Sequence, residues 1–86
     1  MGKKEMGLAV KALAQYASDC LGNGDYLEMD NAFRIALNMA NMHELKEMDW
    51  IADTYATYLD EATENLEEEI AKGNAAKRTL NILQTP

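Results

Sequence analysis

The chain has 86 residues, a net charge of −7 and a single cysteine. A chain of this length buries about 60 to 65% of its unfolded surface, which leaves no room for a deep active site. Apolar residues make up 48% and charged residues 27%, as in ordinary globular domains, so wholesale disorder is excluded. One cysteine cannot form an internal disulfide, and no long apolar run follows a charged start. We therefore expect a single cytoplasmic domain over residues 1–86, without a membrane segment.

The negative charge is concentrated in one segment. Residues 44–72 carry a net charge of −8, residues 73–86 carry +2, and residues 1–25 are balanced. An acidic segment repels nucleic acid, which binds to clustered Lys and Arg, and it attracts basic protein surfaces. We expect a basic protein partner and no direct binding of nucleic acid.

Apolar residues recur at steps of three and four over residues 4–21, which predicts a first helix. Gly22 and Gly24 predict its end, because glycine adopts the left-handed conformation that closes a helix. Asp25 and Glu28 have the spacing of an acidic capping box, in which side-chain oxygens accept hydrogen bonds from the first free amide groups. A second helix is therefore expected to begin at residue 26.

The second helix is predicted to reach about residue 42, with Phe33 and Ile35 on a broad apolar face. No Gly or Pro separates it from the following helical pattern. A continuous helix over residues 26–72 would far exceed the usual length, so we expect a break near residues 41–44.

The third helix, over residues 45–72, has the clearest pattern, and Gly73 is expected to end it. Asn74 is suited to cap a short fourth helix over residues 75–83, with Leu80 and Leu83 docking onto the other helices. The apolar seam of the third helix comprises Met48, Ile51, Tyr55, Tyr58, Leu59, Ala62, Leu66 and Ile70.

Amphipathic helices joined by short connections bury their apolar faces by packing side by side. We therefore predict an all-α fold, a small antiparallel three-helix bundle with a short fourth C-terminal helix. The third helix is longer than the first two, so the alternative is a homodimer formed through its protruding end.

The stretch DCLGNGDYLEMD, from Asp19 to Asp30, resembles the twelve-residue calcium loop of EF-hand proteins, with Gly24 at the sixth position. Leu21 and Leu27 stand at the third and ninth positions, where calcium needs oxygen ligands. We therefore expect a turn between helices, with both leucines facing the core and no bound metal. A weak divalent-metal site is the alternative.

The same region is similar to a tetratricopeptide helical hairpin, with a spacing that differs by one residue. It covers one repeat, whereas such folds need about three. The matching residues are Leu21, Gly22, Tyr26, Ala32 and Ala36.

Catalytic residues are scarce. Nucleophilic catalysis needs a nucleophile, a base and an orienting group within hydrogen-bond reach. Cys20 falls on an apolar helix face, and His43 is the only histidine. We therefore expect no enzymatic activity, no catalytic residue and no cofactor.

The most unusual feature is a set of acidic residues on one face of the third helix, opposite its apolar seam. At about 100° per residue they form a stripe of about 27 Å from Asp49 to Glu67, with Trp50 on its flank. The acidic stripe, together with Trp50, comprises Asp49, Trp50, Asp53, Asp60, Glu61, Glu64, Glu67 and Glu68.

The stripe suggests a small non-enzymatic protein that binds a basic, nucleic-acid-handling protein and inhibits it by nucleic-acid mimicry. In general character the chain resembles compact acidic phage-encoded antagonists of host defence or nucleases, with no shared motif. The alternatives are a structural homo-oligomer whose acidic face is merely solvated, and the weak metal-binding helix-loop-helix.

Overall fold

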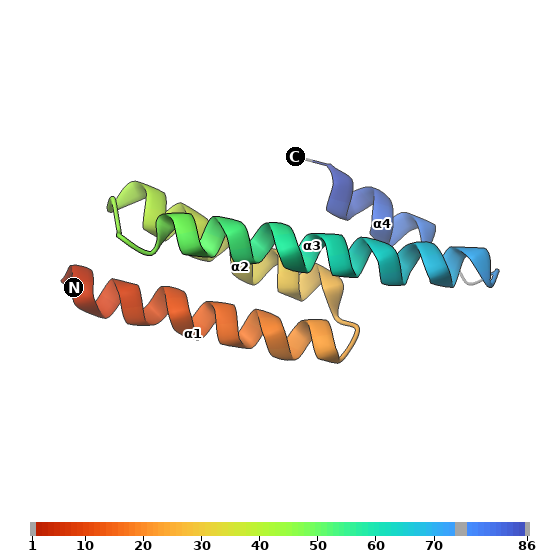
Figure 1. Cartoon of the computed structure of the whole chain (residues 1–86), viewed down its shortest axis with the longest axis horizontal. Helices are drawn as coiled ribbons and strands as arrows, with labels where there is room; N and C mark the ends of the chain where they lie inside the picture. Colours follow the sequence, from red (N-terminus) through yellow and green to blue (C-terminus); the bar gives the residue numbers. More distant parts are fainter. Residues whose placement is uncertain (1, 74–75, 86) are drawn as a thin grey trace.

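The computed structural model describes residues 2–73 and 76–85, which form four α-helices and no strand (Figure 1). The predicted all-α class is therefore confirmed. Asn74, the expected cap of the last helix, lies outside the described residues. None of the helices in the described part of the chain combines the length and apolar composition needed to cross a bilayer. The helices are α1 (Lys3–Gly22), α2 (Tyr26–Met42), α3 (Met48–Ala71) and α4 (Lys77–Gln84).

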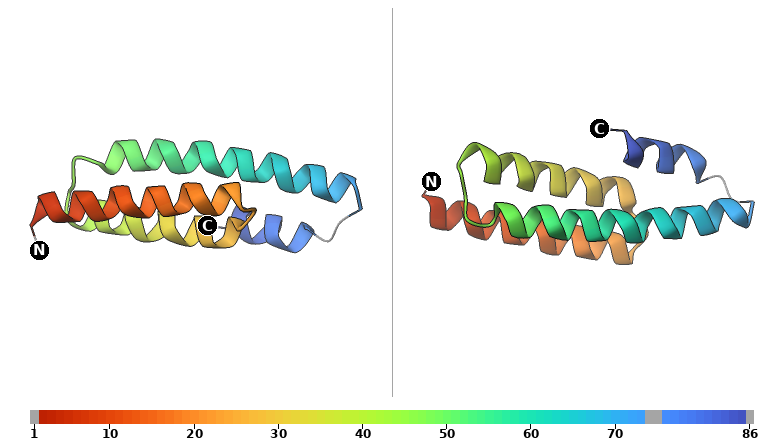
Figure 2. Two further views of the ribbon diagram at one scale, coloured as in Figure 1. Left: turned by 90° about the horizontal axis from the view of Figure 1, so that it is seen from below. Right: turned by 45° about the horizontal axis from the view of Figure 1, so that its top comes forward.

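Successive helices run in alternating directions along an elongated molecule of 48 × 22 × 16 Å (Figure 1). α1 and α2 pack against each other as a hairpin, and α3 returns beside them. The second half of α3 extends beyond the hairpin, and α4 folds back against α2 and α3 (Figure 2). The predicted three-helix bundle is present in part, because α3 packs more extensively on α2 than on α1.

Small side chains bring α1 and α2 close together. The alanines that α1 and α2 bury are Ala14, Ala17, Ala32, Ala36 and Ala40. Phe33 of α2 then fills the space toward α3: it is fully buried and stacks on Tyr55 at 5.2 Å between ring centroids. It also meets Tyr58 edge-on at 5.3 Å. Every residue of the predicted α3 seam is either buried in this core or packed against it.

Two apolar residues of α2 do not face the core as predicted. Ile35 is 54% exposed, and Leu27 is also exposed. At about 100° per residue, Ile35 lies about 160° around the helix from Phe33, and Leu27 about 120°. The predicted apolar face of α2 was therefore too broad.

The turn between α1 and α2 is made by the backbone. Gly24 has a left-handed φ of 77°, and the Asp25 amide donates a hydrogen bond of 2.8 Å to the Cys20 carbonyl. This pattern is a Schellman motif, which satisfies the last carbonyl groups of α1. The predicted capping box is wrong, because Asp25 precedes α2 but forms no side-chain cap hydrogen bond. Its ψ of 71° differs from the extended conformation usual at an N-cap.

The turn between α2 and α3 uses the same motif without glycine. Glu44 takes the left-handed conformation with φ 51°, and the Leu45 amide donates a hydrogen bond of 2.9 Å to the Ala40 carbonyl. Leu45 is buried beside this turn. The break between the two helices therefore lies where the sequence has no glycine to indicate it, and α3 begins at Met48 instead of residue 45.

Replacing Glu44 with glycine is expected to raise the free energy of unfolding by about 0.5 to 1 kcal/mol. The change removes the strain of a left-handed backbone conformation at residue 44, which is roughly 1 to 2 kcal/mol. The greater entropy of glycine in the unfolded chain offsets part of this gain. Urea unfolding followed by circular dichroism measures the difference. Glu44→Val, which adds a β-branched side chain at the same φ, is expected to lower stability. A Glu44→Gly variant less stable than the wild type would contradict this explanation of the turn.

Candidate functional site

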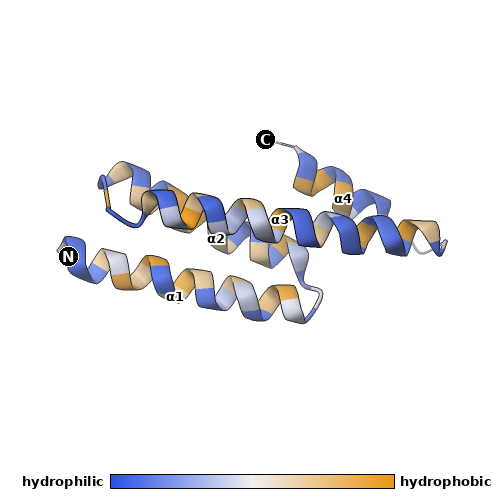
Figure 3. Cartoon of the chain, viewed as in Figure 1, coloured by the Kyte–Doolittle hydropathy of each residue, from blue (hydrophilic) through white to orange (hydrophobic). Residues whose placement is uncertain are grey.

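The acidic stripe lies on the side of α3 that faces away from the core. Ile51, Ala62 and Leu66 are the buried residues of α3, whereas all eight residues of the predicted site are exposed. Figure 3 shows the resulting alternation of hydrophilic and hydrophobic residues along α3. The structure therefore brings the predicted residues together on one helix face open to solvent.

The stripe has little internal charge compensation. Within residues 2–73 and 76–85, its one salt bridge joins Glu68 to the Lys72 amine at 3.1 Å. The hydrogen bond from Lys72 to Glu68 raises the pKa of Lys72. Both side chains are more than half exposed, so the pair contributes little to stability. Six further carboxylates therefore face solvent on this helix without a salt bridge to a described cation.

Trp50 lies on the first turn of α3 between two acidic residues of the stripe, Asp49 and Asp53, in the sequence. It is 47% exposed, so it is not buried against α2. The backbone beneath it is regular, and the Thr54 hydroxyl donates a hydrogen bond of 2.8 Å to the Trp50 carbonyl. An exposed Trp offers apolar contact area, and Trp is one of the residue types enriched at the centres of protein-binding surfaces.

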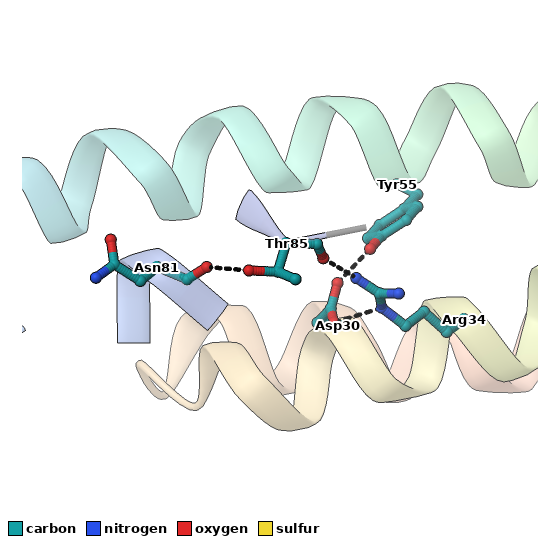
Figure 4. Close-up of polar contacts among 5 residues, drawn as sticks. All are labelled: Asp30, Arg34, Tyr55, Asn81 and Thr85. Carbon is teal, nitrogen blue, oxygen red and sulfur yellow. Dashed lines mark hydrogen bonds and ion pairs between the residues drawn. The ribbon is translucent and has the colours of Figure 1, made fainter. Parts of the chain in front are cut away.

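A second polar cluster, not predicted from the sequence, joins α2, α3 and the end of α4 (Figure 4). Asp30 is buried and accepts hydrogen bonds from the Tyr55 hydroxyl and from Arg34 Nε, the latter at 2.7 Å. Arg34 Nη2 donates a further bond of 3.1 Å to the Thr85 carbonyl, and the Thr85 hydroxyl donates one of 2.8 Å to the Asn81 carbonyl. The spacing of Asp30 and Arg34, four residues apart on one helix, was the available signal.

The Asp30 cluster is best explained as a structural feature that holds α2, α3 and the end of α4 together. A buried carboxylate is costly unless it is paired and hydrogen-bonded, and here both oxygens of Asp30 have donors. Burial and the hydrogen bond to Asp30 raise the pKa of Tyr55 to about 12. The hydrogen bond to Asp30 also raises the pKa of Arg34. At neutral pH Tyr55 and Arg34 are therefore both protonated donors to Asp30.

Because both oxygens of Asp30 accept hydrogen bonds in this cluster, Asp30 does not serve as a ligand in the calcium-like stretch from Asp19 to Asp30. Its carboxylate is buried with Arg34 and Tyr55, whereas Asp19 is exposed on α1 and accepts a hydrogen bond of 3.3 Å from Gln15. Within the described residues, no three His, Cys, Asp or Glu side chains are grouped so that they would hold a metal ion.

The side chains of Cys20 and His43 lie far apart in the structure. Cys20 is buried near the end of α1, and His43 follows the end of α2. Because α1 and α2 are antiparallel, the two residues lie at opposite ends of the hairpin (Figure 1). The length of α2, about 25 Å at 1.5 Å per residue, separates them.

Comparisons of this chain with protein-family models, with curated proteins and with solved structures find no match.

Replacing Tyr55 with Phe is expected to change how stability depends on pH. The folded pKa of about 12 lies above the usual value of 10, so the contribution of Tyr55 is complete below about pH 10 and is lost as pH rises through about 12. The free energy of unfolding should fall less steeply over this range in Tyr55→Phe than in the wild type. Urea unfolding at several pH values measures the slope. Tyr26→Phe, outside the Asp30 cluster, is the control; equal slopes in wild type and Tyr55→Phe would exclude this contribution.

Proposed function

We propose that the chain is a small non-enzymatic protein that binds a basic surface of another protein through the acidic stripe of α3. The observation that supports this most directly is the clustering of eight outward-facing site residues on one helix, seven of them acidic. Like charges four residues apart, such as Asp60 and Glu64, destabilise a helix by about 0.2 to 0.5 kcal/mol per pair. A cationic partner surface offsets that repulsion.

The partner in this proposal is a nucleic-acid-handling protein. Such proteins have cationic grooves that bind the regularly spaced phosphates of a nucleic acid. The stripe presents carboxylates over about 27 Å of a straight helix, which suits a groove of this kind. By occupying the groove the chain acts as a nucleic-acid mimic and inhibits its partner, in the manner of a phage-type antagonist. In this proposal the chain acts on its partner in the cytoplasm.

The helical scaffold serves this function by holding the stripe straight. In the proposal α1, α2 and α3 act as one antiparallel three-helix bundle, and α4 supports the part of α3 that extends past the hairpin. The contacts of Phe33 with Tyr55 and Tyr58 favour this view, because they fix the rotation of α3 about its axis. A preorganised charged face binds without the entropic cost of ordering a flexible segment.

Reversing three charges of the stripe, with Asp60→Lys, Glu64→Lys and Glu67→Lys, is expected to abolish partner binding. The residues are exposed, so the variant should fold, which circular dichroism checks. Binding is measured by capture from an extract of the native host, followed by mass spectrometry and titration of the captured protein. The expected captured protein is basic, binds nucleic acid and loses that activity when the wild-type chain is added.

The matched control reverses three exposed acidic residues of the α1–α2 hairpin, Asp19, Asp25 and Glu28, and so has the same net charge. This control should retain partner binding. Equal loss in both triple variants would indicate an effect of net charge alone, and retention by the α3 variant would exclude the stripe as the binding face. If the chain instead forms a homo-oligomer with a solvated acidic face, assembly is expected to survive the α3 reversal.

Trp50→Ala is expected to weaken binding of the captured partner by about 2 kcal/mol or more, which is roughly thirtyfold in Kd. Truncation of an exposed Trp removes apolar contact area from the interface and leaves the charges in place. Tyr16→Ala is the control, because Tyr16 is an aromatic residue of similar exposure on a different helix, α1. Isothermal titration calorimetry measures both variants. Equal affinities for wild type and Trp50→Ala would place the tryptophan outside the interface.

A further inference from the structure

A cleft of about 630 Å³ lies between the start of α1 and the connection from α2 to α3. The two segments come together at one end of the molecule (Figure 2). Gly7 and Leu45 are buried in this region, and Leu8 adds an apolar side chain that is 60% exposed. Two glutamates, Glu44 and Glu47, also line the cleft.

The cleft gathers positive charge in a chain that is otherwise acidic. Four of the eight Lys and Arg residues line it: Lys3, Lys4, Lys11 and Lys46. Within residues 2–73 and 76–85, none of the four forms a salt bridge. They come from two segments about 35 residues apart in the sequence, so the fold itself assembles them. The lysines outnumber the two glutamates of the lining, and their amines are available to an anion.

The carboxylate of Glu47 occupies a position in the cleft that suits an anionic group. A Cβ atom added to Gly7 would lie 2.8 Å from Glu47 Oε2, so the carboxylate rests against the glycine backbone in space that a side chain would fill. Glu47 is half-buried there and forms no salt bridge with a described residue. Its carboxylate is at the end of a flexible side chain, so a change of rotamer would open this position to an incoming anion.

From this arrangement we propose that the cleft binds an organic anion, a phosphate or carboxylate with an apolar portion. The charged group lies among the lysine amines, and the apolar portion lies against Leu8 and Leu45. A lysine ammonium meets either anion as a compact point charge. The volume falls in the range of about 300 to 1,000 Å³ that is typical of small-molecule sites.

The test is isothermal titration calorimetry of the whole chain with decyl phosphate, decanoate and inorganic phosphate, below the micelle concentration. Decyl phosphate, decanoate or both are expected to bind, and the stronger of the two identifies the anionic group. Inorganic phosphate, which lacks the apolar portion, is expected to bind at least tenfold more weakly than the stronger of the two long-chain anions. The proposal would be overturned if neither decyl phosphate nor decanoate binds. It would also be overturned if the cation decyltrimethylammonium binds equally well.

Two pairs of variants test the site itself. The double variant Lys4→Gln with Lys11→Gln is expected to weaken binding at least tenfold, because each amine lost is a charged contact with the anion. Its control, Lys77→Gln with Arg78→Gln on α4, removes the same charge outside the cleft and should bind as the wild type does. Leu8→Asn should weaken binding of the stronger long-chain anion, and Ile82→Asn, which also replaces an exposed apolar residue, is its control and should not. Binding that the two cleft variants leave unchanged would overturn the assignment.

Discussion

The packing of Phe33 against α3 is the contact on which the exposed face of that helix depends. Its ring is fully buried and contacts Tyr55 and Tyr58, which lie on one side of α3. With that side held inward, the residues about half a turn away must face solvent. Those residues are the acidic stripe. The hydrophobic core and the candidate binding face are therefore two results of the same packing.

The Asp30 cluster adds a polar constraint to this apolar one. Asp30 of α2 accepts a bond from Tyr55 of α3, and Arg34 connects Asp30 to the backbone that follows α4. Removing one donor would leave a buried carboxylate partly unsatisfied, which costs more than the average hydrogen bond contributes. The cluster therefore favours one arrangement of α2, α3 and α4. It also pairs Arg34 internally, away from the stripe.

Helical periodicity predicted the fold class and the α3 seam because these depend on the spacing of apolar residues along each helix. It predicted the stripe for the same reason, since charges opposite a seam face outward. Its failures have physical causes. Ile35 is apolar yet lies far around the helix from Phe33, and Glu44 adopts a left-handed conformation usually taken by glycine. Asp30 is polar yet points inward, because Tyr55 and Arg34 satisfy it.

The lysine cleft was beyond sequence reasoning for a different reason. Lys4 and Lys11 lie on α1, whereas Lys46 follows the left-handed turn at Glu44. The separate segments meet only because the helices return antiparallel to the same end of the molecule. The spacing of residues within one helix does not predict which residues of separate segments come together. Four lysines line the cleft, whereas the stripe carries seven acidic residues, so the two regions differ in charge.

The most direct test of the stripe as a binding face is an NMR titration of the nitrogen-15-labelled chain with its captured basic partner. Amide shifts map the interface without altering any residue. We expect the changes to concentrate at the outward positions between Asp49 and Glu68, with the turn at Gly24 unaffected. Changes confined to α1 or α2, with α3 unperturbed, would contradict the assignment of the acidic stripe as the binding face.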